Sequence, residues 1–396
     1  MLAFLLKHRS AIIFSTLTVV LFLIMMLVEQ ANGRFWLNDF RVFYEAAQAL
    51  VSNEQVYGVT FGLDTGYYKY SPFTLLFFTP FTLLPFSLAS IVQFWIIVAL
   101  TIYLILTLNK LVNKYVFNLK SNNVFLFLIV LIIILNHLIR ELHLGNTNII
   151  LMFLLTLALQ FSLKNKILLA STLLAIVILT KPYFLVLVLP FILYQKWKLI
   201  NSTGLLIVAF VGASILILGW ENGTGLYQDW FVSMSQHSGY LTSSHTISSL
   251  LRNYFSIDLQ GYFDFLFFAL NAGLLFSFFW VLKQKTQITN SDKNQGQLLF
   301  YFLLIASVPN FLITDTEHFL FSIPLLLLIT SYLIKARNIP LSLLFIILAF
   351  FYGGNSSDML GNEGSDNFDK LGFLGLSNLV FIGFIFFFSS KKKFTN

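Results

Sequence analysis

The sequence predicts an all-α polytopic membrane protein, and three observations predict it. Of the 396 residues, 58% are hydrophobic and only 10% are charged, whereas charged residues make up about 25% of a soluble domain. The mean hydropathy is +0.82. Apolar runs recur along the whole chain, several of them approaching the roughly 17–25 residues with which a helix crosses a bilayer. Together these observations exclude a water-soluble fold.

Twelve apolar segments are predicted to cross the membrane as helices. The first follows Lys7 and Arg9, as in a signal peptide, but no small-residue cleavage site comes after it, so we expect a retained helix. Some of the other segments are short for a complete span. The twelve are residues 11–28, 87–108, 124–139, 148–163, 167–180, 183–195, 199–219, 262–282, 297–313, 319–334, 339–352 and 372–389.

The basic residues predict the orientation of these segments. If the N-terminus is cytoplasmic and all twelve segments cross, 17 of the 24 Lys and Arg residues fall inside, and the outer side receives the other 7 together with 16 of the 17 acids. Since Lys and Arg accumulate on the cytoplasmic side, we expect both termini in the cytoplasm. The membrane itself is expected to be a bacterial inner membrane. The longest polar loops, above all residues 29–86 and 220–261, then lie on the periplasmic face. Any chemistry is expected on that face of the cell envelope.

Composition also excludes several kinds of site. The chain contains no Cys, which excludes disulfides, thiolate metal ligands and a Cys nucleophile. The net charge of +7 comes from short clusters between apolar segments, a pattern of membrane orientation rather than nucleic-acid binding. His237 and His245 are spaced like metal ligands, but no tight carboxylate–His cluster accompanies them. We therefore expect no metal and no cofactor.

The first outer loop carries the clearest candidate for an active-site acid. From Asp39 to Val51 the apolar spacing predicts a short helix at the membrane interface, with Asp39 near its N-terminus. Two interpretations stay open: Asp39 is an N-cap, or it is a carboxylate kept ionised by backbone N–H groups and used in catalysis. Pro72, Pro80 and Pro85 then interrupt an apolar run, which indicates a segment that dips into the membrane.

Cations and His residues on the outer side suggest a substrate. Arg140, Lys181 and Arg252 lie near the ends of spans, where they either snorkel to lipid headgroups or bind an anion; with Lys69 they predict a phosphate site. His318, at the start of an apolar run, is a general base, a sugar ligand or an interface residue. A carboxylate, cations and His above apolar segments indicate a substrate with a phosphate, a sugar and a lipid tail. Composition does not separate an enzyme from a transporter.

The order of short motifs along the chain distinguishes an enzyme from a transporter. By these motifs the chain resembles the polyprenol-phosphate-mannose-dependent mannosyltransferases, glycosyltransferase family 87 of the membrane-embedded GT-C superfamily, over about residues 35–335. Ser71 departs from the family's usual Tyr-Pro-Pro, and the last motif lacks the Trp and one His of Ser-Pro-x-x-Trp-x-His-His. In chain order the motifs are Asp39-Phe40, Phe43-Tyr44-Glu45-Ala46-Ala47, Tyr57-Gly58, Tyr70-Ser71-Pro72, Pro80 to Pro85, Trp95, Gly145-Asn146-Thr147-Asn148, Lys181-Pro182, Lys196-Trp197-Lys198, Ser248 to Arg252 and Thr314 to His318.

The resemblance implies a GT-C-like helical bundle, a single transmembrane domain over residues 1–396, whose long first outer loop carries a catalytic Asp. It also implies that a hexose, mannose, passes with inversion from a polyprenyl-phosphate donor to a glycan or glycolipid acceptor, without a nucleotide sugar or a metal. The residues expected in this site are Asp39 and His318 for catalysis, Lys69, Arg140, Lys181 and Arg252 for the donor phosphate, and Tyr44, Asn146, Asn148, His245 and Glu317 for the substrate.

A lipid-linked-sugar flippase is the alternative function. Such a transporter favours charges in the middle of spans and gapped helices in paired halves of the chain. The sequence shows neither feature, because its charged residues lie between the apolar segments. The sequence therefore favours the glycosyltransferase.

Overall fold

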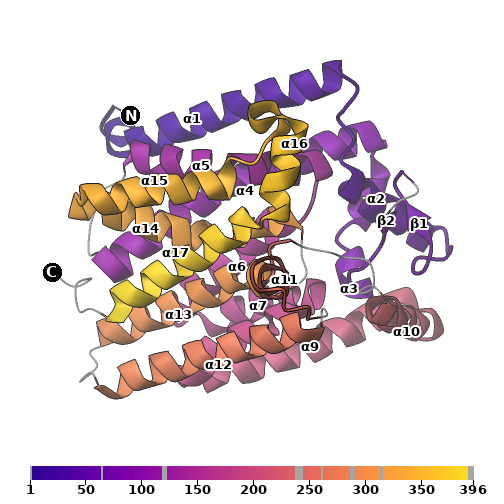
Figure 1. Cartoon of the computed structure of the whole chain (residues 1–396). Coiled ribbons are helices and arrows are strands. Elements are labelled where there is room, and N and C mark those ends of the chain that lie inside the picture. The colour runs from indigo at the N-terminus through magenta and orange to yellow at the C-terminus, as the bar shows by residue number, and fades with distance from the viewer. Residues whose placement is uncertain are drawn as a thin grey trace. The chain divides into compact units, whose positions relative to one another are not determined.

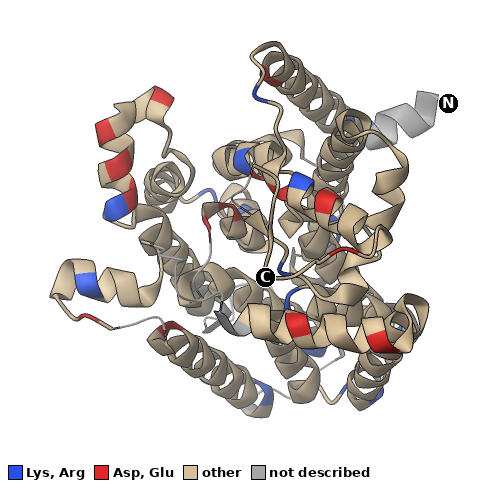
Figure 2. Cartoon of the chain, turned by 90° about the vertical axis from the view of Figure 1, so that its right-hand side faces the viewer, with Lys and Arg blue, Asp and Glu red and all other residues tan. Residues whose placement is uncertain are grey.

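A computed structural model describes residues 2–63, 66–117, 123–236, 244–259, 262–285, 290–312 and 315–390 (Figure 1). Helices dominate, and the strands found in this part of the chain are the short antiparallel pair β1 (Thr60–Phe61) and β2 (Gly66–Tyr67). Long stretches of helix carry neither sign of charge (Figure 2). The prediction of an all-α polytopic membrane protein is confirmed.

Six helical segments in the described residues are long and apolar enough to cross a membrane, and the number is seven if α15 (Ile339–Gly353) and α16 (Ser357–Lys370), which meet at 82°, form one broken span. Four predicted spans instead coincide with shorter apolar helices, so the number twelve stays a prediction. The six segments are Arg9–Ala31 in α1 (Leu2–Ala31), Phe86–Phe117 in α4 (Phe86–Val112) and the π-helical turn η2 (Asn113–Phe117), α5 (Val124–Leu144), α9 (Trp197–Leu218), Tyr262–Gln284 in α12 (Tyr262–Lys285), and Thr316–Ala336 in η5 (Thr316–Ser322) and α14 (Ile323–Ala336).

The chain divides into two compact units. The first unit comprises Met1–Thr18, Ile102–Arg140 and Leu241–Asn396, and the second unit comprises Val19–Thr101 and Glu141–Tyr240. Helices α1, α4 and α5 contribute residues to both units. The single domain over residues 1–396 stays a prediction.

In the second unit, α7 (Ile167–Thr180) packs against α6 (Asn148–Leu163), α9 and the short α3 (Pro72–Leu75). Helix α2 (Asn38–Val51) packs against η1 (Thr79–Leu83) and the β1–β2 pair. The same unit contains η3 (Pro182–Leu187), α8 (Val188–Leu193) and α10 (Trp220–Gln236). The apolar residues of α2 recur three and four positions apart, so one face of the helix is buried. This confirms the short helix predicted after Asp39.

Prolines divide the apolar run in the second half of residues 29–86, as predicted. Pro72 stands at the start of α3, where Ser71 Oγ caps the helix by accepting from Thr74 N at 3.3 Å. Pro80 lies in the first turn of η1, and Pro85 directly precedes α4. A proline costs little at a helix start because the first N–H groups have no partner within the helix. The run therefore forms two short helices, and its entry into the membrane stays a prediction.

In the first unit, α13 (Asn290–Phe311) packs against α12, η5, α14 and α17 (Phe373–Ser390). Helix α11 (Ile247–Phe255) packs against α12 and α17. A buried amide pair links these elements: Asn378 Nδ2 donates to Asn310 Oδ1 at 2.6 Å, and Ser322 Oγ donates to Asn378 Oδ1 at 2.7 Å. Buried polar groups need such partners in an apolar interior. The pair fixes η5 against α13 and α17.

Helix α16 occupies a polar segment between the predicted spans 339–352 and 372–389, which the sequence places on the outer side. Ser356 Oγ accepts from Asp358 N at 3.3 Å and caps the helix, while Asp358 lies in its first turn and Lys370 in its last. Both charges have the sign that suits the helix dipole. Its polar sequence has no apolar periodicity from which a helix could be predicted. The position of this segment on the outer face stays a prediction.

Candidate functional site

Asp39 lies in the first turn of α2, but it is not the N-cap. That position is taken by Leu37, whose backbone is left-handed with φ 41° and ψ 55° and whose side chain makes no capping bond. The N-cap interpretation of Asp39 is therefore wrong. Its side chain is half-buried, and Asn146 Nδ2 donates a hydrogen bond of 2.7 Å to Asp39 Oδ2.

The loop between α5 and α6 brings Asn146 to this carboxylate. Gly145 has a φ of +68°, and a Cβ atom there would lie 2.7 Å from Phe40 Cβ and 3.1 Å from Leu37 Cβ. Gln93 Nε2 also donates to Gly145 O at 3.1 Å. Glycine alone combines this backbone conformation with so close an approach. The loop thus lies directly against the start of α2.

The same loop holds Lys181 through Asn148. Lys181 Nζ donates to Asn148 Oδ1 at 2.6 Å, and its side chain is buried. Asn148 Nδ2 in turn donates to Glu141 Oε2 at 2.9 Å, and Glu141 Oε1 accepts from Ile149 N at 3.0 Å. A buried ammonium group requires such hydrogen bonding. Glu141 therefore orients Asn148, and Asn148 orients Lys181.

Tyr70 completes a group that we name the loop cluster: Asp39, Tyr70, Asn146, Thr147, Asn148 and Lys181. Tyr70 Oη lies 2.9 Å from Thr147 Oγ1 and donates to Asn146 Oδ1 at 3.4 Å. Lys181 Nζ lies 5.9 Å from the centre of the Tyr70 ring. All members belong to the second unit. The cluster thus holds a carboxylate from α2 and an ammonium group from the end of α7 against one short segment, residues 145–148.

Tyr57 binds the backbone of Tyr70. Its hydroxyl donates to Tyr70 O at 2.8 Å. Burial raises the pKa of the Tyr57 hydroxyl well above its ordinary value. The phenol therefore stays protonated and keeps this bond over the whole working range of pH.

The structure places two other predicted residues of the second unit outside the loop cluster. Tyr44 is buried, and its hydroxyl donates to Leu84 O at 2.8 Å. Lys69 directly precedes Tyr70 and is half-buried, with its carbonyl accepting from Trp230 Nε1 at 2.9 Å. Tyr44 therefore joins α2 to the end of η1.

The predicted residues of the first unit make three contacts between basic and acidic side chains. Arg140 Nε donates to Glu317 Oε2 at 2.9 Å; the Arg140 side chain is 52% exposed and that of Glu317 only 1%. His318 Nδ1 lies 3.9 Å from Glu317 Oε1. His245 Nε2 and Asp369 Oδ1 are 2.9 Å apart, while Arg252 is exposed on α11. Arg140, Glu317 and His318 are thus brought together.

Sequence reasoning assigned no role to Tyr70, Glu141 or Asp369. Two of them could have been found from the sequence: Tyr70 belongs to the motif Tyr70-Ser71-Pro72, and Glu141 is an acid at the end of a predicted span, seven residues before Asn148. No local pattern could have indicated Asp369, because its partner, His245, is 124 residues away in the chain. In the described part of the chain, no group of three or more His, Asp or Glu could hold a metal ion. His237 and Thr314 lie outside the described residues.

A family model described as glycosyltransferase family 87 matches residues 68–335, which is more than half of the chain. The match includes most of the loop cluster, from Tyr70 to Lys181, whereas Asp39 precedes it and Asp369 follows it. Among curated proteins, none has a sequence that matches this chain. From the family match, the chain belongs to glycosyltransferase family 87.

Proposed function

We propose that this membrane-embedded glycosyltransferase transfers mannose, which is a hexose, from a polyprenyl-phosphate donor to a glycan or glycolipid acceptor at the outer face. The transfer inverts the configuration of the anomeric carbon. The loop cluster is the observation that supports the proposal. The three-residue loop between α5 and α6 holds Asp39 through Asn146, and the first residue of α6, Asn148, holds Lys181. A carboxylate and a cation are the two charged groups that such a transfer needs.

Asp39 is the general base of this mechanism. As the acceptor oxygen attacks the anomeric carbon, its proton passes to the Asp39 carboxylate, and the bond between that carbon and the phosphate oxygen breaks. A single displacement from the opposite face inverts the anomeric configuration. The bond from Asn146 holds the carboxylate in one orientation, which lowers the cost of reaching the transition state.

Lys181 stabilises the departing polyprenyl phosphate. The leaving group gains negative charge as the sugar departs, and a preorganised cation is most effective where water is excluded. Lys181 is buried and is held by the neutral amide of Asn148. Lys69, next to Tyr70 in the chain, is proposed as a second phosphate ligand.

The base Asp39 and the phosphate ligands Lys181 and Lys69 belong to the second unit. In the first unit, Arg140 and Arg252 are proposed as further phosphate ligands, His318 as a catalytic residue, and His245 and Glu317 as substrate ligands. The geometry that supports these roles is the pairing of Arg140 with Glu317 and the position of His318 beside it. The half-exposed Arg140 side chain has further N–H donors besides the one on Glu317.

The test uses purified full-length protein in a bilayer, supplied with polyprenyl-phosphate hexoses or with nucleotide sugars. We expect sugar release only from the polyprenyl phosphates, first to water and, with a suitable acceptor, to a hydroxyl group. Nuclear magnetic resonance of the product reports the anomeric configuration, and added chelator should not change the rate. Transfer from a nucleotide sugar, or retention of configuration, contradicts the proposal. Movement of the lipid across the bilayer without cleavage indicates the flippase instead.

A further inference from the structure

Tyr183 has a buried hydroxyl group that the fold does not use. The residue lies in η3, two positions after Lys181; part of its side chain is exposed, but its Oη atom is buried. In the described part of the chain it is the one tyrosine whose buried hydroxyl has no hydrogen-bond partner. A buried hydroxyl without a partner destabilises a protein. A Phe ring at this position would avoid that cost, so the hydroxyl indicates a partner other than the fold.

Other tyrosines show how the fold satisfies such a group. The hydroxyls of Tyr44, Tyr57 and Tyr352 each donate to a backbone carbonyl, at distances of 2.8, 2.8 and 2.6 Å. Each of these bonds joins two segments that lie apart in the chain. Tyr183 makes no hydrogen bond of this kind with any described residue.

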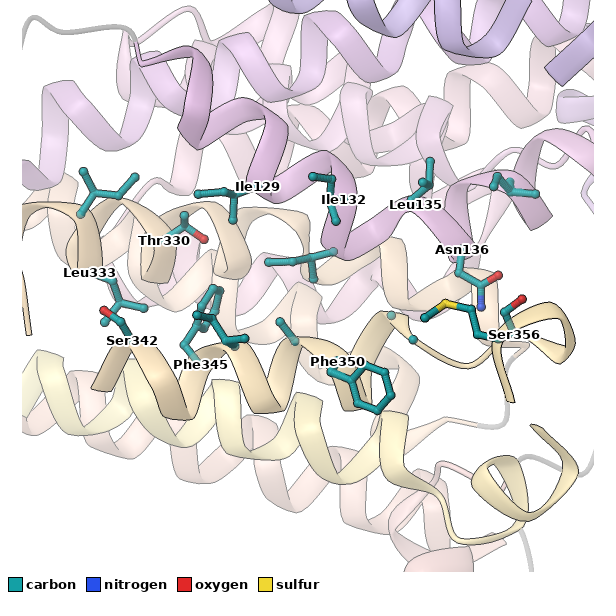
Figure 3. Close-up of a pocket in the computed structure, with 18 residues that line it drawn as sticks. Ile129, Ile132, Leu135, Asn136, Thr330, Leu333, Ser342, Phe345, Phe350 and Ser356 are labelled. Carbon is teal, nitrogen blue, oxygen red and sulfur yellow. The ribbon is translucent and has the colours of Figure 1, made fainter. Parts of the chain in front are cut away.

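The polar side chains that line the apolar pocket of the first unit are also satisfied. The pocket has a volume of about 730 Å³ and lies between α5, α14 and α15 (Figure 3). Its polar lining side chains all take part in hydrogen bonds; they are those of Asn136, Thr330, Ser342 and Ser356. Apolar burial has no directional preference. The pocket therefore suits any hydrocarbon chain, whereas an unpaired buried donor selects a ligand that accepts a hydrogen bond.

Tyr183 lies beside the loop cluster, and both belong to the second unit. Its hydroxyl is close enough to that of Tyr70 for the two groups to interact electrostatically. Lys181 Nζ lies 5.9 Å from the centre of the Tyr70 ring. The unpaired hydroxyl and the buried ammonium group are therefore both neighbours of Tyr70. In the predicted topology Tyr183 also begins the span 183–195 at its outer end, near the depth of lipid phosphates.

We propose that Tyr183 Oη donates a hydrogen bond to the phosphate of the polyprenyl-phosphate donor, beside Lys181. The inference rests on the proposed function and adds a ligand to its phosphate site. A phosphodiester carries one negative charge shared by two oxygen atoms. A neutral O–H group binds one of these oxygens without adding a second buried positive charge. The phenol keeps its proton throughout the reaction, and its hydrogen bond becomes stronger as the leaving phosphate gains charge.

Tyr183→Phe removes only the hydroxyl and is tested in full-length protein in phosphatidylcholine nanodiscs. The probes are farnesyl phosphate, which has no sugar, and its mannosyl phosphodiester, and calorimetric titration measures their binding. We expect the variant to bind each probe about ten-fold more weakly or worse, because both probes carry the phosphate. Tyr103→Phe is the matched control, since this tyrosine is 61% exposed on α4, and it should bind both probes normally. A loss confined to the mannosyl probe would show that the hydroxyl contacts the sugar, and it would overturn the phosphate assignment.

Thermal unfolding separates this role from a structural one. Because the hydroxyl is buried without a partner, Tyr183→Phe without ligand should have a Tm at least as high as that of the unaltered protein. Saturating farnesyl phosphate should then raise the Tm less in the variant than in the unaltered protein. A lower Tm without ligand together with unchanged affinity would show a hydroxyl that is bonded within the protein, and it would overturn the proposal.

Failure of this inference and failure of the proposed function give different results. If the unaltered protein binds the mannosyl probe and releases its sugar, and Tyr183→Phe binds both probes equally well, the role of Tyr183 is overturned and the proposed function stands. If the unaltered protein binds neither probe, the polyprenyl-phosphate donor is itself wrong, and the assignment of Tyr183 to its phosphate is overturned with it.

Discussion

The side-chain amide of Asn146 donates a hydrogen bond of 2.7 Å to the carboxylate of Asp39, a residue 107 positions earlier in the chain. This bond joins α2 to the loop between α5 and α6. Two residues further along, Asn148 accepts from Lys181. The loop between α5 and α6 therefore sets the positions of both the proposed base and the proposed phosphate ligand.

Replacing Asp39 with Asn tests the general base. The variant keeps the shape of the side chain and removes its capacity to take a proton, so turnover should fall by about 10²–10⁴, while donor binding is largely retained. The measurement is sugar release together with donor affinity on folded protein. Glu54→Gln is the matched control, since Glu54 is exposed just beyond the C-terminal end of α2. Transfer near the unaltered rate in Asp39→Asn removes Asp39 from the mechanism.

Lys181→Ala and Arg252→Ala should differ, because their environments differ. Loss of the buried Lys181 is expected to weaken donor binding by about 2–5 kcal/mol, whereas loss of the exposed Arg252 costs about 0–1 kcal/mol. Donor titration by isothermal calorimetry measures both. Lys370→Ala, an exposed charge on α16, is the control. An equal loss in all three variants indicates general electrostatics instead of a phosphate site.

Gly145→Ala should disturb the loop cluster through the backbone. An Ala in the left-handed region costs about 1–2 kcal/mol, and its Cβ atom would lie 2.7 Å from Phe40 Cβ. We expect a lower Tm and slower turnover, because Asn146 is displaced from Asp39. Gly204→Ala is the matched control: this glycine is in α9 with no atom near its added Cβ, and Ala favours a helix. A Gly145→Ala protein as stable and active as the control contradicts this packing.

Arg140 and Glu317 should show coupled stabilities. Arg140→Ala leaves the buried Glu317 carboxylate without the guanidinium, at a cost of about 1–3 kcal/mol. Glu317→Gln in addition removes the charge, so the double variant should regain part of the lost stability. Thermal unfolding of both single variants and of the double variant measures the coupling. Strictly additive effects would show that the pair contributes nothing as a pair.

The orientation predicted from the basic residues is tested by reporter fusions. A fusion at Asn165, between Lys164 and Lys166, should report cytoplasm. One at Asn53, in the first outer loop, should report the periplasm. The reverse result at either position means that a span was missed or added before it, and it places the loop cluster on the other face of the membrane.

The sequence by itself determined the class of fold and the residues at which to look. Hydropathy and apolar spacing act over one or two helical turns, so they predicted the all-α membrane fold and the helix of Asn38–Val51. The order of the motifs identified Asp39, Asn146, Asn148 and Lys181 as candidate site residues. Helix α16, in contrast, could not be predicted from apolar spacing, because its residues are polar and its start is marked by the Ser356 cap.

Only the tertiary structure decided which of these residues meet. It placed Asn146 on Asp39 and Lys181 on Asn148, it turned Tyr44 toward Leu84, and it paired His245 with Asp369. These contacts join positions from 33 to 124 residues apart. They depend on how helices pack through space and on a close approach that Gly145 permits, and no local pattern of residues records either.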